Sequence, residues 1–316
     1  MRKTLLKLAF AIGMLWVTSA VISMHSAQGG PVFETTLPST GAQEDMLWVE
    51  LWTEDGVKEL PMEEYIAGVL ISEMPADFHS EAKKAQAIAA RTFALRTAQT
   101  GLKHGAGMIC ANPECCQGYL TLTEYLSKGG STEGYQKAWE AAKATENLVI
   151  TYDGALIDAT YFSCSGGRTE AAVAVWGSDI PYLQAVDSPG EEDSLFYANT
   201  VYFTARELEE ALNIRLTDGN KNWIKDVSYT DGGGIQSMVI GGIKFSGAQL
   251  RKLLGLRSQS LTATVLSTGV LITTRGWGHR VGLSQYGAEA MAQNGSSFEE
   301  ILTHYYQGVE LETYGQ

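Results

Sequence analysis

The chain has 316 residues, of which 45% are apolar and 19% are charged. This composition is typical of a globular protein with a sizeable core, and it excludes a disordered, collagen-like or coiled-coil chain. The 23 lysines and arginines are outnumbered by 36 acidic residues, for a net charge of −13, so we expect no nucleic acid partner.

The N-terminal residues 1–24 begin with basic side chains and continue in an uncharged, mostly apolar run over residues 8–24. This pattern is typical of a secretory signal peptide or a single-pass membrane anchor. We favour a transmembrane anchor, because a clear cleavage site of small residues is missing. The basic flank then stays in the cytoplasm and the remaining chain lies on the outer face. Residues 25–45, rich in Gly, Pro, Thr and Ser, are predicted to be a linker.

Residues 46–316 are predicted to form one domain of the α+β class. Hydrophobic periodicity and capping residues indicate both helices and strands. A segment at about 195–265 is expected to be an inserted α/β subdomain. The predicted strands are 48–52, 148–152, 227–240 and 261–274, and the predicted helices are 61–70, 80–98, 132–145, 204–212, 246–254 and 284–293.

The sequence Ser72-Glu73-Met74-Pro75 joins the first two predicted helices. Because Pro75 disfavours a helical conformation at Met74, we expect Glu73 at a helix end with apolar neighbours. Such neighbours raise the pKa of a carboxyl group, as a general acid requires near neutral pH. A solvated glutamate at the end of a helix is the alternative.

Lys84 and Arg91 are seven residues apart in the second predicted helix and therefore share one of its faces. We expect them to line a groove together with Glu73. A cation next to Glu73 would lower the pKa of its carboxyl group, so the two cations would bind substrate instead. The alternative is a solvated helix face.

A short loop contains His104, Cys110, Cys115 and Cys116. Thiolates and imidazole are zinc ligands, and the spacing is close to that of zinc sites. Three thiolates with His104 would form a closed structural site, whereas two thiolates with His104 would leave one position open. A disulfide between Cys110 and Cys116 is also compatible with an extracellular segment and would leave Cys115 unpaired. Buried free thiols are the third alternative.

Two further segments are rich in glycine and small polar residues. Residues 163–169 follow an apolar stretch and are expected to form a turn. Residues 276–288 contain several glycines, which allow the backbone to approach a ligand closely. His279 lies in this loop, and Ser284 is expected to cap the following helix.

Together these segments resemble the stage II sporulation protein D family, lytic transglycosylases of endospore formers. The motifs span residues 47–310 in the order of that family. Two positions depart from it, since Arg280 stands where the family has glycine and Cys115 where a non-thiol residue is expected. The resemblance rests on residues 72–76, 81–92, 163–169, 175–177, 181–183 and 278–288.

The resemblance implies a glycan-binding groove and a role for several residues. Glu73 would be the catalytic acid and base, and a structural zinc ion near the active site would be bound by His104, Cys110 and Cys116. The implied substrate contacts are Lys84, Arg91, Ser165, Tyr182, His279, Ser284, Gln285 and Tyr286.

The implied activity is cleavage of peptidoglycan strands, preferably denuded of stem peptides, to 1,6-anhydro-muramic ends during engulfment. The expected partners are a sporulation amidase or endopeptidase and membrane engulfment proteins, in the space between forespore and mother cell. The resemblance also includes amidase enhancers, so that a wall-binding activator without activity of its own is the main alternative. A zinc-stabilised extracellular binding module is another.

Overall fold

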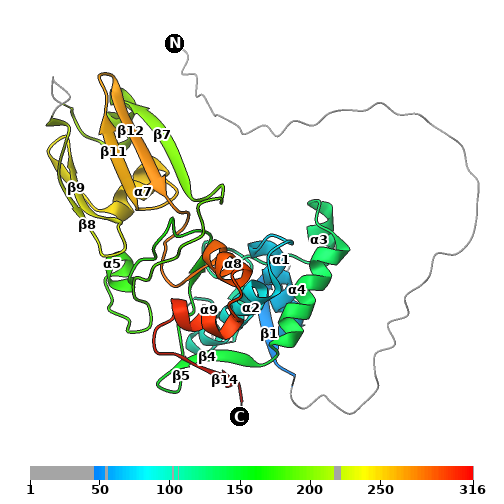
Figure 1. Cartoon of the computed structure of the whole chain (residues 1–316). Helices are drawn as coiled ribbons and strands as arrows, with labels where there is room; N and C mark the ends of the chain where they lie inside the picture. The colour runs from blue at the N-terminus through cyan, green and yellow to red at the C-terminus, as the bar shows by residue number, and fades with distance from the viewer. Residues whose placement is uncertain (1–45, 54–55, 102, 106, 217–221, 316) are drawn as a thin grey trace, which may run out of the picture. The chain divides into compact units, whose positions relative to one another are not determined.

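The computed structural model describes residues 46–315 except 54–55, 102, 106 and 217–221 (Figure 1). The predicted anchor, residues 1–24, and the predicted linker, residues 25–45, lie outside the described residues. Within the described ranges, no helix combines the length and the apolar character that a membrane span needs.

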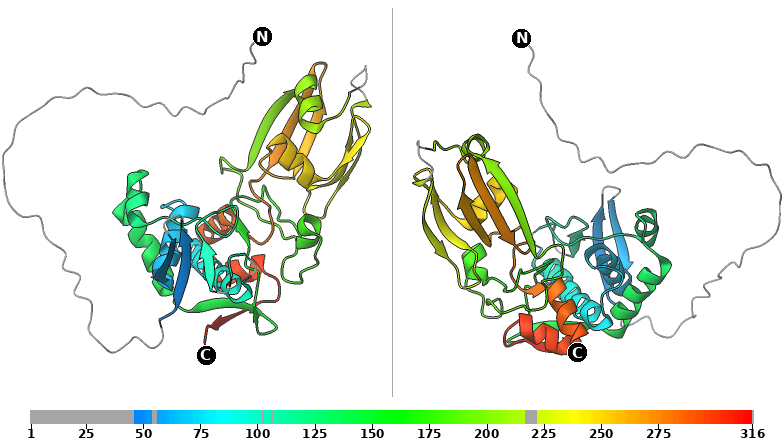
Figure 2. Two further views of the ribbon diagram at one scale, coloured as in Figure 1. Left: turned by 180° about the vertical axis from the view of Figure 1, so that it is seen from behind. Right: turned by 45° about the horizontal axis from the view of Figure 1, so that its top comes forward.

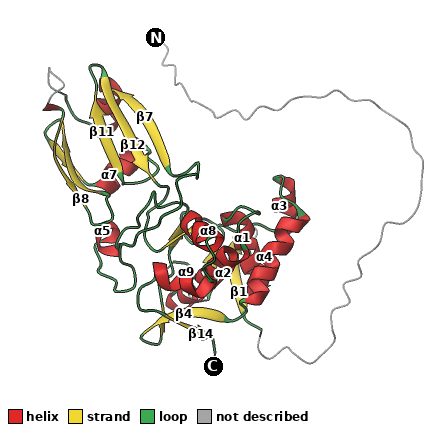
Figure 3. Cartoon of the chain, viewed as in Figure 1, coloured by secondary structure: helices red, strands yellow, loops and turns green. Residues whose placement is uncertain are grey.

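The described residues form nine helices and several small sheets, which confirms the mixed α+β prediction (Figure 3). The sheets have the orders β2-β1-β3, β10-β9-β8, β11-β12-β7, β13-β6 and β14-β4-β5. The helices are α1 (Met62–Glu73), α2 (Ser80–Thr100), α3 (Leu122–Ser127), α4 (Thr132–Ala144), α5 (Ala172–Trp176), α6 (Ala205–Leu212), α7 (Gly247–Leu254), α8 (Gln285–Gln293) and α9 (Phe298–Tyr305). The strands are β1 (Trp48–Thr53), β2 (Gly56–Pro61), β3 (Met108–Cys110), β4 (Leu148–Tyr152), β5 (Ala155–Leu156), β6 (Tyr161–Phe162), β7 (Ala198–Thr204), β8 (Ile224–Tyr229), β9 (Ile235–Ile240), β10 (Ile243–Phe245), β11 (Leu261–Val265), β12 (Gly269–Arg275), β13 (Leu283–Ser284) and β14 (Glu310–Thr313).

Helix α2 lies at the centre of the main core, in contact with α1, α4, α8, α9 and β4 (Figure 2). Most of its alanines are fully buried, and these small side chains allow neighbouring helices to approach it closely. The helix is capped by the side chain of His79, one residue before the predicted cap Ser80. It ends at Gly101, whose left-handed conformation is the usual helix stop.

Helix α1 continues three residues beyond its predicted end at residue 70. Met74 adopts an extended conformation with φ −123° and ψ 144°, as expected for a residue before Pro75. Glu73 is therefore the last residue of the helix, as the sequence indicated.

A buried ion pair joins several elements of this core. The guanidinium of Arg91 on α2 donates two hydrogen bonds to the carboxylate of Glu63 on α1, and the Nε–Oε1 distance is 3.0 Å. It also donates to the carbonyl oxygens of Ala142 at the end of α4 (3.2 Å) and Leu148 at the start of β4 (3.1 Å). Arg91 has no exposed surface, so its position is interior rather than on a substrate groove.

A second hydrophobic core lies within the segment from β7 to β12. Leu208 of α6 and Leu250 of α7 pack there against residues of the sheets, including Val270 and Ile272 of β12. This core therefore extends past residue 265, where the inserted subdomain was predicted to end. We refer to residues 198–275 as the inserted segment.

The stretch predicted to be strand-like over residues 261–274 forms two strands, which pair as the antiparallel hairpin β11–β12. Its strands pair from Leu261 opposite Thr274 to Val265 opposite Val270. The β-branched residues on both sides of the turn share the same strand propensity, which concealed the turn in the sequence.

Arg280 connects the main core to the inserted segment. It adopts a left-handed conformation with φ 67°, for which glycine is the usual residue. Its guanidinium donates to the carbonyl oxygens of Ser165 (2.7 Å), Arg168 (2.6 Å) and Gly232 (2.8 Å), and to the carboxylate of Glu170 (3.3 Å). Since Gly232 belongs to the turn between β8 and β9, this arginine holds that turn against the main core.

The Arg91–Glu63 pair predicts a stability defect. Arg91→Ala should destabilise the protein by about 3–5 kcal/mol, because it leaves the buried carboxylate of Glu63 without its partner. Urea unfolding measures this change. Lys143→Ala, which removes an exposed cation paired with Glu146, serves as the control and should change the midpoint little. Unchanged stability in Arg91→Ala would contradict the structural role.

Candidate functional site

The carboxyl group of Glu73 is held between two segments far apart in the sequence. The backbone N–H of Gly118 donates a hydrogen bond to its Oε1 atom at 2.8 Å. The side-chain amide of Gln285, at the start of α8, donates to Oε2 at 3.4 Å. Both carboxyl oxygens therefore have a fixed donor, and the orientation of the group is determined by the fold.

Burial raises the pKa of Glu73 above its ordinary value near 4.5, and the two hydrogen bonds oppose this shift without cancelling it. Neither a cation nor another carboxylate contributes to the shift. A cation next to Glu73 would have lowered this pKa, but no cation contributes to the shift. A pKa shifted upward is the direction of change that a general acid requires.

The donor to Glu73 belongs to the loop at residues 110–118. A Cβ atom at Gly118 would lie 2.8 Å from the Oε1 atom of Glu73 and 2.6 Å from the Ser72 hydroxyl, so only glycine fits there. The preceding Gln117 is buried, and its amide donates to the Tyr65 hydroxyl (2.9 Å). The Tyr161 hydroxyl donates to the side-chain oxygen of Gln117 (2.7 Å). These bonds fix the loop from both sides.

Glu73 faces a cavity of about 670 Å³. Four of the residues predicted to act in catalysis or substrate binding, Glu73, His279, Gln285 and Tyr286, share it with the predicted metal ligand Cys116. Side chains from the loop at residues 110–118, from β6, from α8 and from the inserted segment form its walls. Its lining residues are Glu73, Pro75, Phe93, Pro113, Glu114, Cys116, Gln117, Thr160, Tyr161, Phe162, Ser163, Phe196, Arg251, Trp277, Gly278, His279, Gln285 and Tyr286.

His279 is a neutral member of the cavity wall. Burial, and then the charge of Arg251, lower the pKa of its imidazole to about 4. Its Nδ1 atom accepts a hydrogen bond from the backbone N–H of Val281 at 3.1 Å. The ring lies 5.6 Å from that of Phe162 and 5.3 Å from that of Trp176, measured between centroids. At neutral pH this side chain offers the cavity shape and polarity but no charge.

Ser165 and Ser284, predicted to contact substrate, have no exposed surface and instead bind the buried carboxylate of Glu191. The Ser165 hydroxyl donates to Oε2 at 2.7 Å, and the Ser284 hydroxyl donates to Oε1. Ser284 also caps α8, as predicted. These two serines support the loops around the cavity from behind.

The structure does not bring Lys84, Arg91 or Tyr182 into the cavity. Lys84 forms an ion pair with Glu81 at 2.7 Å on the surface of α2. Arg91 is held by Glu63 in the core, as described above. The hydroxyl of Tyr182 accepts a hydrogen bond from the backbone N–H of Asp158 at 3.0 Å. Helix spacing predicted a shared face for Lys84 and Arg91, and the family motifs pointed to Tyr182. Neither kind of evidence predicts the direction in which a side chain points.

Several residues of the site were not predicted, among them the cavity residues Tyr161, Gln117 and Arg251 and the Glu73 donor Gly118. Arg251 comes from α7 in the inserted segment, and nothing in the local sequence distinguishes it from a surface arginine. Gln117 and Gly118 follow directly after Cys116, and that adjacency was the one available signal. Trp277 lies in the predicted glycine-rich loop and stacks with Arg257, whose guanidinium carbon is 4.5 Å from the ring centroid.

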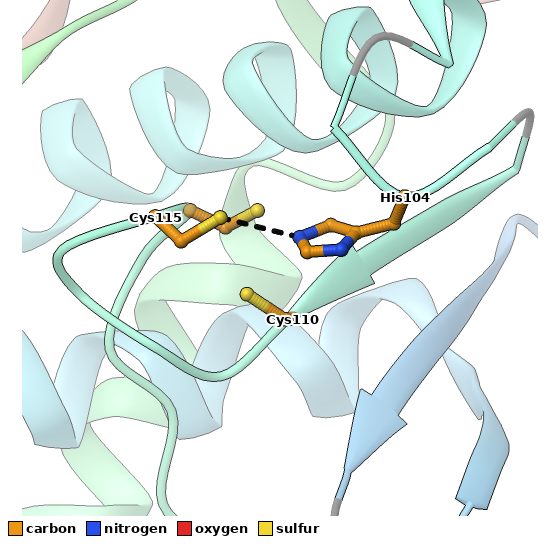
Figure 4. Close-up of side chains that lie close together, drawn as sticks. His104, Cys110 and Cys115 are labelled. Atoms are coloured by element: carbon orange, nitrogen blue, oxygen red, sulfur yellow. Dashed lines mark hydrogen bonds between the residues drawn. The ribbon is translucent and has the colours of Figure 1, made fainter.

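The predicted metal ligands come together at one point. The ligand atoms of His104, Cys110, Cys115 and Cys116 all lie within 4.8 Å of one another. The Sγ atom of Cys115 is 3.3 Å from the Nε2 atom of His104, and Figure 4 shows the imidazole of His104 directed at the sulfur atoms. Cys115, which the sequence left as a departure from the family, belongs to this cluster.

The donor set suits a metal ion that prefers soft ligands, because three thiolates and one imidazole match a closed tetrahedral site. All four cysteines of the chain are free thiols in the structure. Cys116 is both a member of the cluster and part of the cavity wall. The cluster is thus two residues from the N–H group that holds Glu73.

Comparison with known proteins agrees with the sequence motifs. A family model described as stage II sporulation protein matches residues 53–152. Two proteins named stage II sporulation protein D, from Bacillus amyloliquefaciens and Bacillus subtilis, are each 38% identical over 259 residues. These matches cover 81% of this chain and 75% of each relative. The chain belongs to the stage II sporulation protein D family.

The similarity to these relatives of the stage II sporulation protein D family confirms the resemblance seen in the sequence motifs. A Bacillus subtilis protein named amidase enhancer is also similar, with 28% identity over 306 residues, 79% of this chain and 40% of that protein. One protein similar to this chain is therefore named as an enhancer of an enzyme and not as an enzyme itself. Arg280 has the left-handed backbone conformation that glycine usually adopts.

The raised pKa of Glu73 predicts a stability that depends on pH. The folded state holds this proton more tightly than the unfolded chain, so the group lowers stability as pH rises above about 4.5. Glu73→Gln should therefore be more stable than the wild type at pH 7, and the difference should disappear towards pH 4. Urea unfolding at the two pH values measures it.

Glu124→Gln provides a control of opposite sign. Hydrogen bonds from Thr121 lower the pKa of Glu124, so its carboxylate stabilises the fold above the ordinary pKa and this contribution is lost on acidification. That variant should be less stable than the wild type at pH 7 and should approach it at low pH. A Glu73→Gln difference that stays constant with pH would show that burial does not raise this pKa.

Proposed function

We propose that the protein is a lytic transglycosylase that cleaves peptidoglycan glycan strands. The observation that carries the proposal is the carboxyl group of Glu73, half-buried in a cavity with a raised pKa and with both oxygens held by fixed donors. Family membership supports the same function, because the motif around Glu73 matches the position of the family's catalytic glutamate.

In the first step, Glu73 donates its proton to the glycosidic oxygen while the bond to the anomeric carbon breaks. The positive charge that develops on the sugar ring is close to the new carboxylate, which stabilises it. The N–H group of Gly118 and the amide of Gln285 then hold that carboxylate in place, since both donate to its oxygens.

In the second step, the C6 hydroxyl of the same sugar attacks the anomeric carbon. Glu73, now a carboxylate, removes the hydroxyl proton and returns to its initial state. The product has a 1,6-anhydro-muramic end. The nucleophile belongs to the substrate and has a high effective concentration, so no nucleophile from the protein is needed.

A hydrolase would use a second carboxylate, and Glu114 is the other acidic residue that lines the cavity. Its side chain is exposed to solvent, and it does not contribute to the pKa shift of Glu73. These features favour the one-carboxylate reaction over a two-carboxylate hydrolysis.

The aromatic side chains of Trp277 and Tyr286 offer flat apolar faces for the sugar rings. Trp277 is 40% exposed at the edge of the cavity. His279 and Gln285 add polar groups that are suited to hydroxyl and acetamido groups. These contacts are electrically neutral, which suits the hydroxyl and acetamido groups of the sugars.

Zinc is our proposal for the cluster of His104 and the three neighbouring cysteines. His104, Cys110, Cys115 and Cys116 would bind it, and the ion would supply a structural cross-link rather than chemistry. The cross-link would stiffen the loop that leads from Cys116 to Gly118, and thereby the hydrogen bond to Glu73. Relative to the sequence-based ligand set, Cys115 is added.

We also propose, from the family, that the protein acts at the outer face of the membrane between forespore and mother cell. Its partners there would be glycan strands, a sporulation amidase or endopeptidase, and membrane engulfment proteins. An amidase that removes stem peptides would supply the denuded strands that we propose as substrate.

The main alternative is an activator that binds the wall without cleaving it. The similarity to a protein named amidase enhancer favours this reading. Mass spectrometry of digested glycan strands separates the two functions, because only the transglycosylase creates anhydro ends.

Glu73→Gln should lower the rate of anhydro-end formation by about 10²–10⁴-fold, because the variant cannot transfer a proton while its shape and most hydrogen bonds remain. Glu114→Gln is the matched control and should retain most of the activity. Mass spectrometry of timed digests measures both. Near wild-type activity in Glu73→Gln would refute the assignment. Wild-type cleavage that leaves reducing ends without anhydro groups, and that is lost in both variants, would indicate a two-carboxylate hydrolase.

The purified, reduced protein should contain about one zinc ion per chain. Cys115→Ser should reduce zinc affinity and lower the unfolding temperature, because metal binding energy is also folding energy. Metal analysis and thermal unfolding measure these changes. Cys164→Ser, at a buried thiol that binds Glu191 instead, is the control and should retain the metal.

A disulfide between Cys110 and Cys116 makes the opposite forecast. Metal analysis would then give almost no zinc, and thiol titration of the unfolded protein would find only Cys115 and Cys164 free. If Cys115→Ser binds zinc as tightly as the wild type, Cys115 is not a ligand and the set of three predicted from the sequence stands.

A further inference from the structure

Arg251 is a cation that faces the cavity without a partner. It lies in the last turn of α7, is half-buried, and lines the same cavity as Glu73. Across the part of the chain that the structure describes, no hydrogen bond or ion pair holds its guanidinium. Burial alone lowers the pKa of this group, as expected for a charge that has lost water and gained no counter-ion.

The other arginines with limited exposure are all held by acceptors. Arg91 and Arg280 bind carboxylates and carbonyl groups in the interior. Arg96 donates to the carbonyl of Leu156, Arg168 to the carboxylate of Asp187, and Arg257 to the carbonyl of Leu195. Arg251 alone among the half-buried and buried arginines of the described residues keeps all its donors free.

The surroundings of Arg251 leave those donors available to a ligand. His279 is the neighbour whose pKa its charge lowers, and this imidazole is neutral. Glu73 is not affected by a cation, so Arg251 does not pair with the acid. Glu114, the other carboxylate of the cavity wall, forms no ion pair with it and is exposed to solvent. The free positive charge therefore lies in the cavity at some distance from the reacting group.

We propose that Arg251 binds the lactyl carboxylate of a muramic acid residue and thereby selects strands that carry no stem peptide. This inference rests on the proposed function and assigns a specificity-determining residue to it. In such strands the lactyl carboxylate is the one charged group of the repeating disaccharide. A guanidinium matches it with two parallel N–H···O bonds. A stem peptide converts the same carboxylate into an amide, which has no charge to offer.

The role that the sequence assigned to Arg91 thus passes to a residue from another part of the chain. Arg91 is confined to the core by Glu63, whereas Arg251 reaches the cavity from the inserted segment. Acid and specificity residue then belong to different elements, α1 and α7, on the wall of one cavity.

Binding to the Glu73→Gln protein tests the proposal, since that variant holds the substrate without turnover. The three ligands are denuded glycan strands, the same strands with the lactyl carboxylates converted to methylamides, and a chito-oligosaccharide. Adding Arg251→Gln should weaken binding of the denuded strands about tenfold and leave the other two ligands unchanged. Arg251→Lys should retain part of the affinity, and high salt should reduce the preference.

Lys252→Gln is the matched control, because it removes the same charge from an exposed position on the same helix turn. It should leave all three affinities unchanged. Thermal unfolding establishes that each variant is folded. Equal weakening for all three ligands, or no weakening for the denuded strands, would overturn the role of Arg251. Because the readout is binding, a wild type that forms no anhydro ends would refute the transglycosylase reaction without deciding this test.

Discussion

The ion pair between Arg91 and Glu63 is the interaction on which the arrangement of the site depends. One guanidinium binds α1 through Glu63, and it also binds the end of α4 and the start of β4 through their carbonyl oxygens. Helix α1 carries Glu73 at its far end, so the angle between α1 and α2 determines where the carboxyl group lies. A lysine would supply the charge but not the fork that reaches three elements at once.

Burial and hydrogen bonding shift the pKa of Glu73 in opposite directions, and their balance decides whether the group can act as an acid. Burial favours the protonated form, while the N–H of Gly118 and the amide of Gln285 favour the carboxylate. Burial is the larger of the two. An acid that must lose one proton and then take up another benefits from this arrangement, because the donors are already in place when the negative charge develops. The cluster of His104 and three cysteines lies on the loop that supplies one of those donors, which ties a structural element directly to the reacting group.

The sequence predicted the position of Glu73 correctly because a local rule applied, namely the effect of Pro75 on the preceding residue. His279, Gln285 and Tyr286 line the same cavity. The glycine-rich loop pointed to His279, and the family resemblance pointed to Gln285 and Tyr286. Local rules failed for Arg91, because helix periodicity defines a shared face without saying whether core or solvent covers it. They also missed Arg251, whose proposed role follows from its place on the wall of the cavity, far from Glu73 in the sequence. The hairpin of β11 and β12 escaped because strand propensity is equal on both sides of its turn.

Arg280 shows that a backbone conformation typical of glycine can also be adopted by a residue with a side chain. The backbone there is left-handed, at a cost of roughly 1 kcal/mol for a residue with a side chain. The guanidinium offsets that cost through three carbonyl groups and Glu170, which hold the residue in place. The fold therefore requires a positive φ angle at this position, and glycine is only the residue that adopts it most often. A side chain at this position is thus compatible with the fold when acceptors hold it, as three carbonyl groups and Glu170 do here.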